Sequence, residues 1–253
     1  MSVGHAHALF VHGHSRVHRL PAHVKLVALA VFVVAVVATP RELVWAFALD
    51  AGLVSAAAAA AHLGPRSVAT RMLIGAPVLV GALLLPVVGA GPRVDVGGFW
   101  LSLDGMWGAW SVIAKGTISL AASIVVTATT PVPELLAGLT ILRAPGVVTA
   151  IAGFMVRYLE VIAGELRRTR VAMASRGYQP TFAWQVGPIA GSVGALFIRS
   201  HERGERVYDA MVSRGYQGRL PQLGATGASS QDWVCALALP LCATAVATLG
   251  LIA

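Results

Sequence analysis

A short arginine motif occurs twice in the chain. Residues 172–179 read Ala-Met-Ala-Ser-Arg-Gly-Tyr-Gln, and residues 210–217 repeat them 38 positions later with a single change, Val for Ala at the third position. The guanidinium group of Arg176 or Arg214 presents five donors in a rigid fork that suits a carboxylate. We therefore expect the two motifs to dock into two acid-lined grooves on a partner.

Each copy also has the composition of a helix end. Gly177 and Gly215 suit the left-handed position that closes a helix, and the preceding arginine favours the negative end of the helix dipole. A repeated helix stop is therefore the alternative interpretation, and it is compatible with docking. It does not explain why the residues around each Arg-Gly pair are also shared. The candidate docking residues therefore include Ser175, Tyr178, Gln179, Ser213, Tyr216 and Gln217.

Two ionisable residues, Asp50 and Lys115, lie inside apolar stretches of the sequence. Such residues are functional candidates because a charge is expensive within a membrane. If both stretches cross the membrane, the two residues could share a depth and form an ion pair. Three interpretations stay open: a structural pair, a Lys115 side chain that reaches toward water, and an intramembrane enzyme with a cleft around the pair.

Four histidines near the N-terminus, His5, His7, His12 and His14, have an alternate spacing that could chelate a metal on an extended segment. Imidazole suits divalent nickel, cobalt and zinc. The alternative, which we favour, is a solvated polar tail without a metal. The sequence also lacks a His-Glu-x-x-His zinc motif, a Gly-x-x-x-x-Gly-Lys phosphate loop and a Gly-x-Ser-x-Gly elbow, so it offers no familiar catalytic site.

The composition shows which class of protein must position these residues. Hydrophobic residues make up 57% of the 253 positions and charged residues 12%, against about 25% charged residues in soluble proteins. The mean hydropathy is +0.75. A soluble fold of this size could not hide so much apolar surface, so the chain is predicted to be an integral membrane protein.

Five apolar segments have about the 20 residues that a helix needs to cross a bilayer. They comprise residues 24–39, 43–63, 72–90, 105–129 and 233–252. Trp100, Trp107 and Trp110, near the start of the fourth segment, are typical of an interfacial aromatic belt. The sequence therefore predicts an all-α polytopic membrane protein with about five transmembrane helices.

The basic residues are unevenly distributed. The net charge is +8, and residues 143–219 alone hold eleven arginines against five acids. Because basic loops stay on the cytoplasmic side during insertion, this segment and the N-terminus are predicted to be cytoplasmic and the C-terminus to lie outside the inner membrane. Nucleic-acid binding is the rival interpretation of an arginine-rich segment, but we do not expect it, because the arginines are interleaved with acids and lie between spans.

Residues 131–220 do not resemble ordinary spans. Apolar residues 147–156 and 182–198 each run directly into a charged helical pattern. Each would form a helix of about 30 residues, or roughly 45 Å, apolar at one end and amphipathic at the other. Such helices could begin at the membrane and project into the cytoplasm. The alternative treats both apolar stretches as further spans, which gives seven in all.

The predicted organisation therefore has four parts. They are a His-rich cytoplasmic segment (1–23), a four-helix transmembrane region (24–130), a cytoplasmic domain of long helices (131–220), and a linker with the last transmembrane helix (221–253). This organisation puts both arginine motifs at the ends of long helices on one side of the membrane.

The Ser-Arg-Gly motifs at the ends of two long helices resemble the signature of T components, the transmembrane coupling subunits of energy-coupling factor (ECF) transporters of the ABC class. The resemblance extends over nearly the whole chain. His18-Arg19-Leu20-Pro21, with Val24-Lys25-Leu26, is similar to the N-terminal motif of the family. Four further segments resemble the cobalt-type, CbiQ-like branch of the family. They are Thr39-Pro40-Arg41-Glu42, Thr129–Leu136, Gly153–Tyr158 and Arg203–Tyr208.

This resemblance implies an importer with four parts. Two cytoplasmic ABC-type ATPases would bind the coupling helices, with Arg176 and Arg214 in grooves on the two subunits. A separate membrane S component, with which a small accessory membrane subunit could associate, would bind the cargo. ATP would be hydrolysed on partner chains, so this chain would be non-catalytic, without a cofactor or metal of its own. The expected cargo is cobalt for cobalamin synthesis; nickel or a vitamin such as biotin is the alternative.

Overall fold

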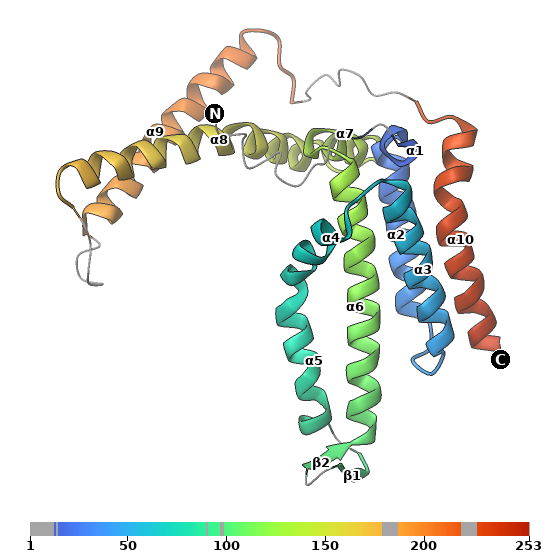
Figure 1. The fold of residues 1–253 in the computed structure, drawn as a ribbon. Coiled ribbons are helices and arrows are strands. Elements are labelled where there is room, and N and C mark those ends of the chain that lie inside the picture. The colour runs from blue at the N-terminus through green and yellow to red at the C-terminus, as the bar shows by residue number, and fades with distance from the viewer. Residues whose placement is uncertain are drawn as a thin grey trace. The chain divides into compact units, whose positions relative to one another are not determined.

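The computed structural model describes residues 13, 15–89, 91–96, 99–178, 187–218 and 227–252. These residues belong to two compact units, one containing Leu139–Gly224 and the other containing Leu9–Gly138 and Ala225–Ala253. Apart from one short hairpin, the described elements are helices (Figure 1). The predominantly helical prediction is therefore confirmed.

The larger unit contains most of the elements. They are α1 (Arg16–Arg19), α2 (Ala22–Ala38), α3 (Val44–Ala60), α4 (Pro65–Met72), the 3-10 turn η2 (Leu73–Gly75), α5 (Ala76–Val88), β1 (Arg93–Val96), β2 (Phe99–Ser102), α6 (Leu103–Thr129), most of α7 (Val132–Ile141) and α10 (Ser230–Ile252). Figure 1 shows α2, α3, α6 and α10 running side by side, with α5 along α6.

Helix boundaries in this unit follow local chemistry. α2 ends at Ala38, and its C-cap residue Thr39 is extended, because a residue before proline, here Pro40, is disfavoured in the helical conformation. α4 begins with Pro65 at its first position, where the missing N–H has no cost. At the start of α6, the Ser102 hydroxyl accepts a hydrogen bond from the Gly105 N–H at 3.2 Å. Prolines and polar caps therefore set the helix lengths.

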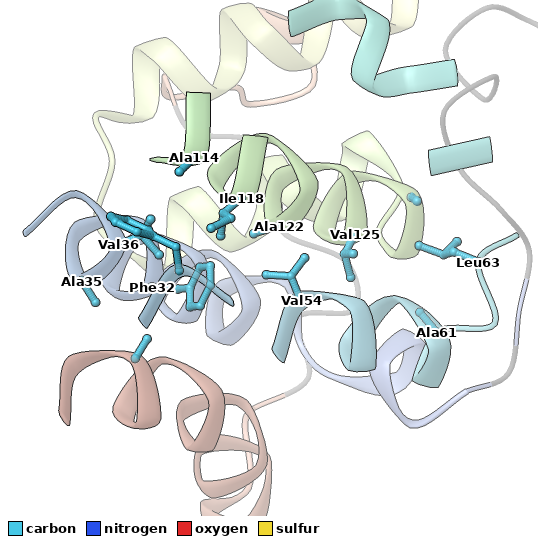
Figure 2. Packing of buried hydrophobic residues seen from close by; sticks show 13 residues of the cluster. Phe32, Ala35, Val36, Val54, Ala61, Leu63, Ala114, Ile118, Ala122 and Val125 are labelled. Atoms are coloured by element: carbon cyan, nitrogen blue, oxygen red, sulfur yellow. The ribbon is translucent and has the colours of Figure 1, made fainter. Parts of the chain in front are cut away.

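Small and aliphatic residues form the core of the larger unit (Figure 2). Phe32 on α2 and Val54 on α3 lie toward Ile118 and Val125 on α6. Close packing also depends on Gly105, because a Cβ atom there would overlap the Leu85 carbonyl of α5. Helices that approach this closely are typical of membrane proteins, in which small residues take the interface positions.

Four helical segments are long and apolar enough to cross a membrane: Pro65–Val88, Leu103–Thr129, Gly146–Ser175 and Ser230–Thr248. α2 and α3 are also apolar but have 17 residues each. Three of the four long segments correspond to predicted spans. The fourth is the helix that the sequence pattern assigned to the membrane-to-cytoplasm transition.

The hairpin was not predicted. β1 and β2 pair antiparallel, with Arg93 opposite Ser102 and Val96 opposite Phe99. The signal in the sequence was the Gly97-Gly98 pair between two short runs rich in apolar residues, a pattern typical of tight hairpins.

The smaller unit holds two long helices. α8 spans Gly146–Ser175, so its 30 residues confirm the predicted continuous helix. α9 spans Gly187–Val212 and has 26 residues. The first residues of its predicted apolar stretch, 182–186, lie outside the described residues. α8 and α9 contact each other.

Candidate functional site

The two Arg-Gly motifs end their helices in the same way. Gly177 has a φ of 77° and Gly215 a φ of 86°, the left-handed conformation that favours glycine. After α8, the Gly177 N–H donates to the Ala174 carbonyl at 3.0 Å, and the Tyr178 N–H donates to the Met173 carbonyl at 3.1 Å. This pair of bonds is the Schellman motif.

The second copy reproduces the first bond for bond. The Gly215 N–H donates to the Val212 carbonyl and the Tyr216 N–H to the Met211 carbonyl, both at 2.9 Å. The two serine hydroxyls also correspond: Ser175 bonds to the Ala172 carbonyl and Ser213 to the Ala210 carbonyl, each at 3.0 Å. The repeat in the sequence is therefore a repeat in three dimensions.

The cap also involves two of the shared residues outside the Arg-Gly pair. Met173 and Tyr178 are the two ends of the longer Schellman bond, and an apolar pair at these positions often accompanies the motif. Gln217 is exposed and is not used in the cap. Gln179 lies outside the described residues.

The arginine of each motif remains available for a partner. Arg176 is the C-cap residue of α8, and Arg214 lies at the matching position after α9. Both side chains are exposed, and neither forms a hydrogen bond or ion pair within the part of the chain that the structure describes. Two guanidinium groups are thus presented on helix ends that have the same cap geometry.

A buried glutamate joins the two helices that carry the motifs. Glu165 on α8 lies 3.3 Å from Arg199 Nη1 and 3.3 Å from Arg203 Nη2, both on α9. Its side chain is only 11% exposed, which strengthens both contacts relative to surface pairs. This role of Glu165 was not predicted from the sequence. The available signal was the Arg199–Arg203 spacing of four, which puts both guanidinium groups on one helix face.

A second polar contact, in the larger unit, involves the N-terminal motif. The Lys25 ammonium group is buried on α2 and donates to the Thr130 hydroxyl at 2.9 Å, the Thr129 carbonyl at 3.2 Å and the His18 carbonyl at 3.4 Å. Lys25 thereby satisfies a carbonyl at the C-terminal end of α6, where a cation also favours the helix dipole. The sequence motif gave no indication of these partners.

Asp50 and Lys115 do not form the predicted pair. The Lys115 ammonium group donates to the Val37 carbonyl in the last turn of α2 at 2.7 Å. Asp50 is fully buried on α3, and neither of its carboxylate oxygens has a hydrogen-bond partner among the described residues. The expectation failed because similar depth in a bundle does not bring two side chains to the same side of their helices.

The predicted histidine group cannot be described, because His5, His7, His12 and His14 lie outside the described residues. In the part of the chain that is described, no group of three or more His, Cys, Asp or Glu residues could hold a metal ion. The His23 ring instead packs edge-on at 6.1 Å from that of Trp233.

Comparison with known proteins adds a family and two relatives. The CbiQ family, described as cobalt transport protein, matches residues 13–223. The chain is 26% identical over 143 residues to a protein of Methanocorpusculum labreanum described as a fused cobalt transport protein, CbiMQ, covering 54% of this chain and 24% of that protein. It is 31% identical over 104 residues to the nickel permease LarQ of Lactiplantibacillus plantarum, covering 41% of this chain and 38% of the permease.

The matched segments span well under half the length of either relative. The family match, by contrast, extends over most of this chain and includes both arginine motifs, Glu165 and Lys25. The long apolar helices agree with a multi-pass membrane protein. The chain therefore belongs to the CbiQ cobalt transport protein family, the T components of energy-coupling factor transporters.

Proposed function

We propose that this chain couples two ABC-type ATPase subunits to a membrane S component in an ATP-driven importer. The coupling residues are the triplets Ser175-Arg176-Gly177 and Ser213-Arg214-Gly215, supported by Tyr178, Gln179, Tyr216 and Gln217. The observation that carries the proposal is the pair of identical helix ends, each presenting an arginine that has no partner within the described part of the chain. Two equal docking points suit two ATPase subunits.

The rigid geometry supports a mechanical role. Each guanidinium group would enter a carboxylate-lined groove, as its donor fork suits. When the ATPases close on ATP, α8 and α9 would move with the grooves, and the ion pairs of Glu165 on α8 with Arg199 and Arg203 on α9 would couple the two movements. Such transmission requires that the helices contact the ATPases differently in the open and closed arrangements.

Catalysis is not part of this role. A CbiQ protein is a non-catalytic transporter subunit, so the intramembrane-enzyme interpretation of Asp50 and Lys115 is wrong. The geometry agrees with a non-catalytic role, because Lys115 donates to the Val37 carbonyl, whereas the Asp50 carboxylate has no hydrogen-bond partner among the described residues. ATP hydrolysis is accordingly assigned to the partner ATPases.

The proposed cargo is cobalt for cobalamin synthesis, bound by the S component. The family description and the cobalt-transport relative support it. The similarity to a nickel permease supports nickel as the alternative, and a vitamin such as biotin would follow from a different S component. The fused CbiMQ relative supports a partner in the membrane, to which a small accessory subunit could be added.

We further propose the orientation in the inner membrane. The N-terminus and residues 131–220 would face the cytoplasm, and the C-terminus would lie outside. The arginine excess of residues 143–219 supports this assignment. Arg41 and Asp104 form an ion pair at 3.8 Å, so the loop after α2 and the start of α6, both assigned to the outside, lie at the same end of the larger unit.

A pull-down tests the coupling role. The tagged chain is extracted from its native membrane in mild detergent, and co-purified proteins are identified by mass spectrometry. We expect an ABC-type ATPase with the wild type, none with the double variant Arg176→Ala, Arg214→Ala, and full recovery with the control Arg167→Ala, Arg170→Ala. Abundant wild-type protein without any ATPase would contradict the proposal. Other co-purified membrane proteins would identify the S component.

A further inference from the structure

α8 and α9 form a pocket of about 730 Å³ between them. Its charged and aromatic lining residues are Arg157, Arg203, Arg206, Arg214, Phe154 and Tyr158. Arg214 belongs to the second arginine motif, as do the lining residues Ala210 and Met211, but the other arginines and both rings lie outside it, so the coupling role leaves most of this pocket unexplained. Its volume lies in the range of ligand sites.

Most of the positive charge in the pocket has no acidic partner among the described residues. None of its lining residues is acidic. Arg203 contacts Glu165 through Nη2, whereas its Nη1 is buried and has no hydrogen-bond partner. Arg157, Arg206 and Arg214 form no hydrogen bond or ion pair with any described residue. Because a buried donor without an acceptor is unfavourable, the geometry calls for an anion with several acceptor oxygens, as a phosphate group has.

Apolar and aromatic groups adjoin the arginines on the α8 side of the pocket. The rings of Phe154 and Tyr158 stack with centroids 6.4 Å apart. Just before Arg157, α8 exposes an apolar stripe at intervals of four residues, formed by Val147 (68% exposed), Ile151 (55%) and Met155 (67%). A free phosphate ion would use the arginines but not this stripe. A helix whose apolar stripe leads into arginines is typical of binding at the membrane surface.

We propose that this arginine pocket binds the phosphate group of an anionic phospholipid, whose acyl chains lie along the apolar stripe of α8. The membrane in which the protein resides supplies this ligand, and the pocket supplies up to four guanidinium groups. The proposal does not depend on ATPase docking. It adds that Arg214 lies where the lipid and an ATPase groove would meet.

Lipid retention tests this proposal on the full-length chain. The chain is purified in a neutral maltoside detergent and titrated with dioleoyl phosphatidylglycerol or dioleoyl phosphatidylcholine, and bound lipids are counted by native mass spectrometry. We expect preferential retention of phosphatidylglycerol. The double variant Arg157→Gln, Arg206→Gln should weaken it about 30-fold, since each arginine near an anionic lipid contributes a factor of about five.

Matched variants separate a pocket from diffuse charge. Arg167→Gln, Arg170→Gln removes the same charge from exposed positions of α8 outside the pocket, and we expect a change below about threefold. Arg157→Lys, Arg206→Lys keeps the charge and should retain most of the preference. Equal losses in the two glutamine double variants would overturn the proposal.

Two further arms test the identity of the ligand. Inorganic phosphate or glycerol phosphate that binds as tightly as the lipid would overturn the assignment to a phospholipid. A loss of ATPase recovery in Arg157→Gln, Arg206→Gln, with unchanged retention of phosphatidylglycerol, would show that the pocket receives an acidic protein segment instead. Failure of the coupling role is seen separately, because it depends on Arg176 together with Arg214.

Discussion

The glycines of the two arginine motifs determine where each guanidinium group points. At a φ near 80°, a side chain is strained by about 1–2 kcal/mol. We therefore expect Gly177→Ala or Gly215→Ala to fray the helix end and weaken ATPase recovery in the pull-down, although the arginine is intact. Asparagine tolerates this conformation better, so Gly→Asn at the same positions should restore part of the binding.

A matched control for these variants is Gly204→Ala in the interior of α9. A Cβ atom at Gly204 meets nothing within 4 Å, and alanine is favoured over glycine in a helix by about 1 kcal/mol. ATPase recovery should therefore be unchanged. If Gly177→Ala and Gly215→Ala also leave it unchanged, the cap geometry does not position the arginines.

The two lysines of the apolar helices should differ in their contribution to stability. Lys25→Met removes a donor from two buried oxygens of the α6 end, which we expect to cost about 1–3 kcal/mol. Lys115→Met removes one bond to a single carbonyl at a less buried site, so its effect should be smaller. Thermal unfolding of the purified chain in detergent measures both, and equal midpoints for the two variants would contradict the assignment of Lys25.

Individual residue contacts were the least predictable part of the chain. The arginine motifs are local, so their repeated letters were enough to predict two helix ends with available guanidinium groups. The pairing of Asp50 with Lys115 was wrong because it depends on how two helices are rotated about their axes. Glu165 was missed for the same reason: a charged helix face does not show which of its acids a second helix buries.

At the scale of elements, Glu165 should control how α8 and α9 move together. Glu165→Gln keeps the shape of the side chain but leaves Arg199 and Arg203 without their shared acid. We expect this change to weaken the α8–α9 contact by about 1–2 kcal/mol, between the values for exposed and buried pairs. ATPase recovery should persist while metal uptake by the assembled transporter falls.

Hydrogen exchange and uptake measurements check this expectation. Faster exchange of α9 amides in Glu165→Gln than in the wild type would show the weakened contact. Glu160→Gln is the matched control, because Glu160 is exposed on the same helix and has no ion pair among the described residues. If Glu165→Gln and Glu160→Gln show equal uptake, the ion pairs do not couple the two helices.

Element boundaries were largely predictable because their causes are local. Pro40 and Pro131 follow the ends of α2 and α6, close to the predicted segment ends at 39 and 129, whereas the start of α4 at Pro65 was not predicted. The apolar start of α8 continues into its charged half as one helix. The β1–β2 hairpin was missed because hydropathy dominated the interpretation of residues 90–104. α7 was also missed, because it has only ten residues and carries Pro133 at its second position, which leaves a weak helical period.

At the scale of the whole molecule, the charge distribution predicts how the chain is oriented in the membrane, and this orientation can be tested. If residues 143–219 are cytoplasmic, the loop at Glu42 must face outward and the loop at Arg66 inward. Both side chains are exposed in the structure and can report on solvent. In a background of Cys235→Ser, Cys242→Ser, we expect a membrane-impermeant maleimide to label Glu42→Cys in intact cells without an outer membrane.

Arg66→Cys should be labelled only after the membrane is permeabilised, because its loop lies on the side that retains basic residues. The ion pair between Arg41 and Asp104 gives a second reporter of the same end: Asp104→Cys should be labelled together with Glu42→Cys. Labelling of Arg66→Cys in intact cells, with Glu42→Cys labelled only after permeabilisation, would show that the orientation is the opposite of the one proposed. It would also place the arginine motifs outside the compartment that contains ATP. That result would therefore contradict the coupling role as well as the proposed topology.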